Sequence, residues 1–274
     1  MSAQRRGVLP GFRTSLAYTL AYAGILVVIP LGALVLRASQ LGIGGILRVA
    51  SEPRTWAALE LSFGASAAAA CIDALLGLLL AWTLARHEFV GRRLLDAIID
   101  LPFALPTAVA GISLTTLFVP DGWLGRPLSR LGLRVAFEPI GIVVALAFIG
   151  LPFVVRTVQP VLEDLDRDLE EAAWILGATG VQTFVRVYFP LLLPPLLTGF
   201  ALAFARGLGE YGSVVFISGN MPMRTEIAPL LIVTKLEQYD YVGATALATV
   251  MLGASFVLLF VINLLQRRFR REAV

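Results

Sequence analysis

Residues 241–266 read YVGATALATVMLGASFVLLFVINLLQ and carry no charged side chain. Crossing a hydrocarbon core of about 30 Å takes roughly 20 helical residues, so this stretch is long enough to span a bilayer. Four more uncharged windows lie at 14–36, 101–120, 139–155 and 187–205. Together these windows predict an all-α membrane protein.

The overall composition points the same way. The 274 residues are 58% hydrophobic and 15% charged, with a mean hydropathy of +0.83, and a water-facing surface needs more charge than this. A soluble enzyme is therefore excluded. The net charge of +3 does not indicate nucleic acid as a partner, because the arginines lie at the ends of apolar windows, where topology explains them. Membrane lipid is the expected surrounding.

Six spans are expected in a single transmembrane domain that covers 1–274. They run over 15–36, 57–85, 95–119, 139–155, 191–217 and 243–265. An even number of spans puts both termini on one side of the membrane. Loops on that side hold 13 Lys or Arg against 8 on the other, and cytoplasmic loops carry the positive excess, so both termini are predicted to be cytoplasmic. The extracytoplasmic loops are then 37–56, 120–138 and 218–242.

Several kinds of catalytic and metal site are missing from the sequence. Cys71 is the single cysteine and His87 the single histidine, which excludes a disulfide, a cysteine-based zinc site and a two-histidine metal site. The single lysine, Lys235, lies between Thr234 and Leu236, so the P-loop pattern GxxxxGK[ST] is absent. We expect no catalytic residue, metal or cofactor, and a partner or coupled ion must power any uphill transport.

The segment 156–190 is the longest predicted cytoplasmic stretch. Its six carboxylates and four leucines, spaced by three, four and seven, predict an amphipathic helix outside the membrane. The leucines are Leu162, Leu165, Leu169 and Leu176. Gly177 tolerates the left-handed conformation that ends a helix, and Thr179 with Gln182 makes a capping-box pattern that begins another. Two short helices with a tight corner are expected.

Glu171-Ala172-Ala173, three residues, Gly177, nine residues and Val187-Tyr188-Phe189-Pro190 resemble the EAA loop (EAA-x3-G-x9-I-x-L-P) of ATP-binding-cassette importer permeases. Valine and phenylalanine replace the usual isoleucine and leucine. In that family the loop forms a coupling helix that lies in a groove of a separate ATPase subunit. The resemblance implies a type I importer permease fold with a cytoplasmic coupling-helix hairpin. It also implies a dimer of partner ATPase subunits that binds ATP and magnesium. The alternative interpretation of this segment is an ordinary solvated surface helix.

The resemblance extends over about 5–265 and narrows to sulfate and thiosulfate permeases. It rests on GRRLLDA and DLPFALPTAVAG within 91–111, PFVVRTVQPVLE at 152–163, RGLGEYG at 206–212 and ISGN at 217–220. The opening RGVLPGF at 6–12 resembles the T subunit of such importers rather than its W partner, which favours a heterodimer with a second homologous permease subunit. A bacterial inner-membrane location and an extracytoplasmic sulfate-binding protein are also implied. Asp73 departs from the pattern, since an amide is expected there in relatives.

Arg206 and Glu210 are charges inside a predicted span, and each such charge costs about 2.5–3.5 kcal/mol at mid-helix. They are four residues apart, on one helical face. One interpretation is a buried clamp that fixes a bend at Gly207 and Gly209. The other is a pathway role, in which Arg206 offers a passing dianion a transient cation while Glu210 prevents tight retention.

Pro102 and Pro106 remove two backbone donors from the third span, which a membrane tolerates only against protein or a water-filled cavity. This favours a pathway-lining position for that span over simple kinking, with Thr107 as a hydroxyl donor to an oxyanion. Asp100 is expected to cap a neighbouring helix or to pair with an arginine, and Asp73 to form a hydrogen bond between helices.

The predicted function is a non-catalytic permease subunit that forms half of the pathway of an ATP-driven sulfate or thiosulfate importer. The permease core is placed at 57–265 and the cytoplasmic coupling loop at 157–190. A permease for molybdate or tungstate is the nearest alternative. A further alternative is an ion-coupled secondary transporter, with Asp73, Asp100 and Glu210 on a proton or cation path.

Overall fold

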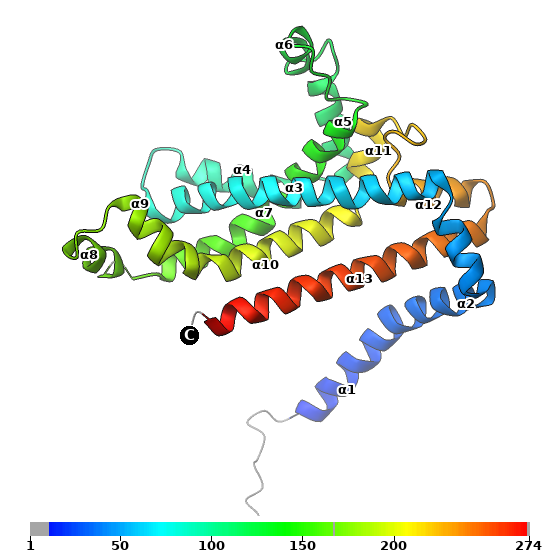
Figure 1. Ribbon diagram of the computed structural model, residues 1–274, viewed down its shortest axis with the longest axis horizontal. Helices are drawn as coiled ribbons and strands as arrows, with labels where there is room; N and C mark the ends of the chain where they lie inside the picture. Colours follow the sequence, from blue (N-terminus) through cyan, green and yellow to red (C-terminus); the bar gives the residue numbers. More distant parts are fainter. Residues whose placement is uncertain (1–10, 167, 273–274) are drawn as a thin grey trace, which may run out of the picture.

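The structure is a computed structural model that describes residues 11–166 and 168–272 and builds this part of the chain from helices (Figure 1). The long ones are α1 (Phe12–Ala23), which continues through the π-helical η1 (Gly24–Val28) into α2 (Ile29–Ala50), and α3 (Pro53–Arg86), α7 (Pro139–Asp164), α10 (Phe189–Leu208) and α13 (Tyr241–Glu272). The shorter ones are α4 (Arg92–Ala104), α5 (Thr107–Phe118), α6 (Gly125–Arg130), α8 (Asp168–Ile175), α9 (Gly180–Thr183), η2 (Phe184–Tyr188), α11 (Gly212–Ser218) and α12 (Ala228–Glu237). The predicted likeness of 6–12 to a T subunit lies mostly outside the described residues.

Helices α3, α7 and α10 form the centre of a bundle, and α13 packs beside α10 and α2 (Figure 1). Their buried side chains form one cluster that runs from Leu84 of α3 through Val154 of α7 to Phe204 of α10. The three helices approach closely because glycines face Val154. A methyl group at Gly77 would lie 2.6 Å from Val154 Cγ1, and one at Gly199 would lie 2.8 Å from its Cα. Small residues at helix contacts are typical of membrane bundles.

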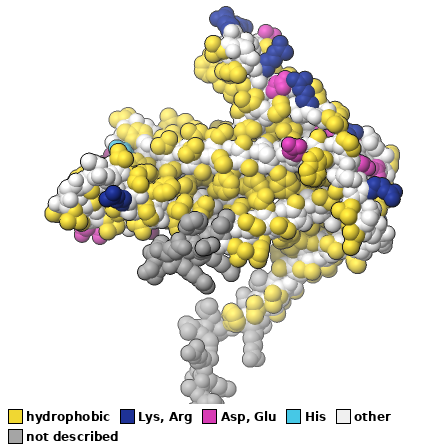
Figure 2. Space-filling model, viewed as in Figure 1, with side chains coloured by type: hydrophobic (Ala, Val, Ile, Leu, Met, Phe, Trp, Pro, Cys, Tyr) yellow, Lys and Arg dark blue, Asp and Glu magenta, His cyan; other side chains and the backbone are white. Residues whose placement is uncertain are grey.

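Five helices of the described part are long and apolar enough to cross a membrane, and the bent pair α4–α5 makes a sixth if it is counted as one span. The five are Thr14–Ala50, Pro53–Arg86, Pro139–Asp164, Gly180–Leu208 and Tyr241–Leu264. Figure 2 shows hydrophobic side chains over most of the visible bundle, with charged side chains gathered toward its ends and on α6. The prediction of an all-α membrane protein is confirmed. Each predicted span overlaps one of these helices, but the fifth, 191–217, is broken after Leu208, and its last part lies on α11.

Two predicted spans are shorter than the helices that contain them. The first continues to Ala50, so most of the predicted loop 37–56 is helical and only kinked, at Gly42, whose φ is 64°. The fourth continues past Val155 to Asp164. In both cases the charged residue taken as the boundary, Arg37 or Arg156, lies inside the helix. A charge ends an apolar window without ending a helix.

The third predicted span is broken, which corrects the expectation of one helix over 95–119. The helix axis bends by 115° between α4 and α5. Leu105 and Pro106 are both extended, with ψ of 134° and 133°. At Leu105 this follows because the ring of Pro106 disfavours a helical conformation at the residue before it. Pro102, in contrast, is accommodated inside α4. As a result α5 leaves the direction of the bundle and carries α6 away from it (Figure 1).

Candidate functional site

The hairpin formed by α8 and α9 lies at one end of the bundle (Figure 1). Gly177 has a φ of 79°, and its N–H donates to the carbonyl of Trp174 at 2.9 Å. Thr179 and Gln182 form the reciprocal capping box that begins α9. The prediction of two short helices with a tight corner at Gly177 is therefore confirmed.

The predicted amphipathic helix through four leucines is wrong. Leu165 is extended, with ψ of 123°, and ends α7, so Leu162 belongs to the buried side of α7 and not to the hairpin. Leu176, expected on the same apolar face, is 87% exposed. The leucine spacing continued across a break that the spacing itself could not reveal.

The tip of the hairpin is an exposed apolar surface. Its members are Trp174, Ile175, Leu176, Val181 and Val185, all of them more than half exposed. Glu171 and Ala172 are also exposed, and Ala173 is half-buried. An exposed apolar surface rimmed by polar residues marks a site of interaction with another protein or with a membrane. The four residues predicted to couple the chain to an ATPase lie on this hairpin.

The second break lies between α10 and α11, where the Arg206–Glu210 pair was predicted to fix a bend. Arg206 Nη1 lies 2.6 Å from Glu210 Oε2. Glu210 is 2% exposed, and its Oε1 accepts hydrogen bonds from the backbone N–H of Ser213 at 2.9 Å and from the Ser213 hydroxyl at 3.1 Å. Glu210 thus joins the end of α10 to the first turn of α11, which is the geometry of a clamp. A third of the Arg206 side chain remains exposed.

The two breaks meet. The Thr107 hydroxyl lies against Gly212, and a methyl group at Gly111 would lie 2.5 Å from the carbonyl oxygen of Ser213. The first turn of α5 therefore packs on the first turn of α11, and Thr107 lies beside the loop that Glu210 holds. Pro106 precedes this contact, and Pro102 lies one turn earlier in α4. The five predicted pathway residues are placed on two neighbouring helix breaks.

A second ionic cluster joins α4 to α7, and the sequence had not predicted that Arg156 and Asp96 belong to it. The guanidinium of Arg156 binds the Asp100 carboxylate in a bidentate manner, with Nε donating to Oδ1 at 2.8 Å and Nη2 donating to Oδ2 at 2.6 Å. Its Nη1 also donates to Asp96 Oδ1 at 2.8 Å and to Gln159 at 3.0 Å. The expectation that Asp100 pairs with an arginine is confirmed. The sequence feature that could have indicated this cluster is the pair Asp96 and Asp100, which are four residues apart on one face of α4.

Asp73 lies in the middle of the bundle without the hydrogen bond that was predicted for it. Asp73 is 1% exposed, its Oδ2 lies against Gly150 of α7, and its Oδ1 has no partner among the described residues. Gly150 makes room for the carboxyl group, since any side chain there would overlap with it.

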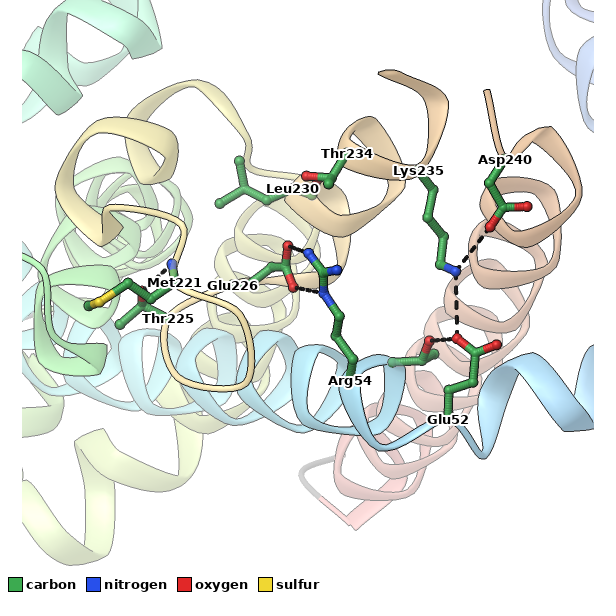
Figure 3. A network of polar contacts seen from close by, with 10 residues as sticks. Glu52, Arg54, Met221, Thr225, Glu226, Leu230, Thr234, Lys235 and Asp240 are labelled. Atoms are coloured by element: carbon green, nitrogen blue, oxygen red, sulfur yellow. Dashed lines mark hydrogen bonds and ion pairs between the residues drawn. The ribbon is translucent and has the colours of Figure 1, made fainter. Parts of the chain in front are cut away.

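The opposite end of the bundle is held by a polar network (Figure 3). Arg54, at the start of α3, binds Glu226 with Nε–Oε2 at 2.7 Å and Nη2–Oε1 at 2.8 Å. Lys235 of α12 lies 3.5 Å from Glu52 and 3.2 Å from Asp240. Asp240 accepts the backbone N–H of Gly243 at 2.8 Å. This hydrogen bond and the neighbouring Lys235 hold the pKa of Asp240 below its ordinary value, although partial burial opposes them.

Long apolar helices, two neighbouring helix breaks and a helical hairpin at one end of the bundle define a multi-pass membrane permease. Residues 74–272 match the family described as binding-protein-dependent transport system inner membrane component, and the chain belongs to this family. It is accordingly a multi-pass protein of the inner membrane.

Two relatives match nearly the whole chain. The sulfate transport system permease protein CysT of Salmonella typhimurium is 47% identical over 274 residues, which cover 100% of this chain and 99% of the relative. The probable sulfate transport system permease protein cysT of Nephroselmis olivacea is 49% identical over 255 residues, 93% of this chain and 90% of the relative.

The fold also has a solved counterpart. It is similar to a chain in the crystal structure of a bacterial alginate ABC transporter in complex with an alginate pentasaccharide-bound periplasmic protein, with a TM-score of 0.75, 20% identity and 93% coverage of each chain. At this identity the likeness shows the fold, which is that of an ABC importer permease, as predicted.

Proposed function

We propose that this chain is a permease subunit of an ATP-driven importer of sulfate or thiosulfate and forms half of the transmembrane pathway. The observation that carries the proposal is the identity of 47% along the whole chain to a relative named as a sulfate permease. The partners are a dimer of ATPase subunits, which binds ATP and magnesium, a second homologous permease subunit in a heterodimer, and an extracytoplasmic sulfate-binding protein. The permease core is 57–265.

Coupling to the ATPase is assigned to the loop 157–190. The support is the apolar tip of the α8–α9 hairpin, which lies at one end of the bundle and is exposed in the described part of the chain. Glu171, Ala172, Ala173 and Gly177 are the coupling residues. Exposed tryptophan and branched aliphatic side chains are costly to leave in water, and burying them in a groove of a partner repays that cost.

The pathway is assigned to the neighbouring breaks that carry Pro102, Pro106, Thr107, Arg206 and Glu210. Broken helices at membrane depth are tolerated where they face protein or a water-filled cavity. Arg206 faces one carboxylate, whereas Arg156 faces two. The two arginine side chains are about equally exposed, so the smaller number of counter-charges makes Arg206 attract an anion more strongly.

Uptake by intact cells tests the function. The host is a bacterium that lacks its own T-type sulfate permease. When it is complemented with this chain and with the ATPase and second permease encoded beside it, it should accumulate labelled sulfate in an ATP-dependent way. Excess thiosulfate should compete and molybdate should not. Preferential uptake of molybdate would favour the molybdate and tungstate alternative, and uptake that needs no ATPase but collapses with an uncoupler would favour a secondary transporter.

Substitution of Gly177 by proline tests the coupling role. Proline fixes φ near −65° and has no N–H, whereas Gly177 needs a φ of 79° and donates to Trp174. We expect Gly177→Pro, or Ala172→Trp on the adjacent exposed face, to leave the spans folded while ATP hydrolysis no longer drives uptake. Gly180→Ala is the matched control, because an added methyl group there meets no atom within 4 Å. Retained coupling in reconstituted Gly177→Pro complexes would contradict the assignment.

A further inference from the structure

The attachment of α8 to the bundle is narrow. α8 has no buried residue, and a cavity of about 350 Å³ separates it from the end of α3, lined by Trp82, Arg86, His87, Glu170, Glu171 and Trp174. Glu170, which lines this cavity, accepts a hydrogen bond on its Oε2 from the hydroxyl of Tyr188 at 2.9 Å. This hydrogen bond to a carboxylate joins α8 to the residue that precedes α10.

Tyr188 itself is firmly seated. It is 2% exposed, its ring meets that of Trp82 edge to face at 5.0 Å, and the guanidinium of Arg86 lies 5.2 Å from its centroid. Both partners belong to α3. Arg86 also donates from Nη2 to the carbonyl of Leu165 at 3.3 Å, which ties α3 to the linker between α7 and α8. A displacement of Tyr188 must therefore displace the end of α3.

Tyr188 also stands directly before α10. This helix has 20 residues, about 30 Å at 1.5 Å per residue, and its other end carries Arg206 and the Glu210 clamp. One continuous helix thus has the hydrogen bond to α8 at one end and the candidate pathway residues at the other.

We propose that the hydrogen bond between Glu170 and Tyr188 is the link by which movement of the coupling helix α8 reaches α3 and α10. Glu170 and Tyr188 are then positioning residues for transport, distinct from Glu171, Ala172, Ala173 and Gly177, which face the ATPase. The cavity beneath α8 gives the helix room to move while the bond keeps it attached. The inference rests on the proposed function, because it requires that an ATPase moves α8.

The test uses the complete complex in proteoliposomes, supplied with the binding protein and sulfate. The measured quantity is the number of sulfate ions transported per ATP hydrolysed. Tyr188→Phe removes the hydroxyl and keeps the ring packed on Trp82 and Arg86. We expect this ratio to fall about ten-fold, the factor that corresponds to loss of one hydrogen bond to a charged group, while the rate of ATP hydrolysis is retained. Glu170→Ala should have the same effect.

The double variant separates a shared bond from two independent defects. If Glu170 and Tyr188 act through one hydrogen bond, the double variant is no worse than either single variant. Asp168→Ala is the matched control, since it removes an exposed carboxylate from the same helix and should couple like the unchanged chain. Normal coupling by Tyr188→Phe, or losses that multiply in the double variant, would overturn the inference. Absence of ATP-driven uptake by the unchanged complex would instead overturn the proposed function, and the inference with it.

Discussion

The two oxygens of the Glu210 carboxylate have different partners, and this separates the expected effects of two substitutions. Oε2 pairs with Arg206, and Oε1 holds the first turn of α11 through Ser213. Arg206→Ala leaves the bonds to Ser213 in place, so we expect the protein to assemble and to lose sulfate uptake. Glu210→Ala removes the clamp and leaves the buried backbone N–H of Ser213 without its acceptor, which costs about 1–3 kcal/mol.

The measurements are the yield of monodisperse protein in detergent and the uptake of labelled sulfate. Glu210→Ala should lower the yield, and Arg206→Ala should lower uptake alone. Arg206→Lys is the control, because it keeps the positive charge and loses the planar fork. Normal uptake by Arg206→Ala would leave Arg206 with a purely structural role.

The contribution of Asp240 to the free energy of unfolding depends on pH in a defined direction. Its folded pKa lies below the ordinary value, which is about 3.9 in an unfolded chain. The stabilisation is therefore complete above about pH 4 and is lost as the pH falls below it, because the folded state must then take up a proton it binds weakly. Asp240→Asn keeps a capping oxygen for Gly243 but has no charge to lose. Melting temperatures measured from pH 7 to pH 3 should converge for the two proteins at the acid end; a constant difference would contradict this assignment.

Spacing within a helix predicted the Arg206–Glu210 pair, because residues four apart share a face. It could not predict that Arg156 binds Asp100 and Asp96, which are 56 and 60 positions away. That cluster exists because α4 packs on α7, and no local pattern reports such packing. Asp73 shows the converse, since its burial was anticipated from its place in an apolar span while its missing partner was not.

The contact between α5 and α11 is a helix pairing without room for side chains. An added methyl group at Gly111 would lie 2.5 Å from Ser213 O and 2.7 Å from its Cα, and backbone atoms cannot give way as a flexible side chain can. We expect Gly111→Ala to separate the two helices, to destabilise the chain by about 1–3 kcal/mol and to lower sulfate uptake. Gly253→Ala in α13, where an added methyl group meets no atom within 4 Å, should do neither. Equal melting temperatures for the two variants would contradict the close contact.

The apolar windows predicted where helices lie, because hydrophobic length is a local property. They did not predict the direction of α5. The proline pair signalled a disturbance, yet Pro102 stays within α4 and Pro106 turns the chain by 115°. The difference arises because Leu105 and Pro106 are both extended. The local sequence permits this extended conformation, and the packing of α5 on α11 favours it over a continuous helix. The hairpin was predictable in outline because its glycine and capping box are local signals.

The number of crossings depends on α4 and α5 taken together. α3 and α7 run parallel: Arg86, at the last turn of α3, binds the carbonyl that ends α7, and Ala57, near the start of α3, shares a pocket with Pro139, which begins α7. The chain between two parallel helices must return across the membrane. We therefore expect the bent pair to be one crossing, which gives six crossings and places both termini on the side of the α8–α9 hairpin.

Reporter fusions test this arrangement for the whole chain. Alkaline phosphatase, which becomes active only outside the cytoplasm, should be active when fused after Gly132 or Gln238 and inactive when fused after Gly180 or Val274. The excess of positive charge on the terminal side, 13 Lys or Arg against 8, sets this orientation. If α4 and α5 did not cross, the fusion at Gly132 would be inactive and the fusion at Gly180 would be active, because α7 lies between the two positions. If the orientation were reversed, every activity would be exchanged, and the α8–α9 hairpin would face away from any cytoplasmic ATPase.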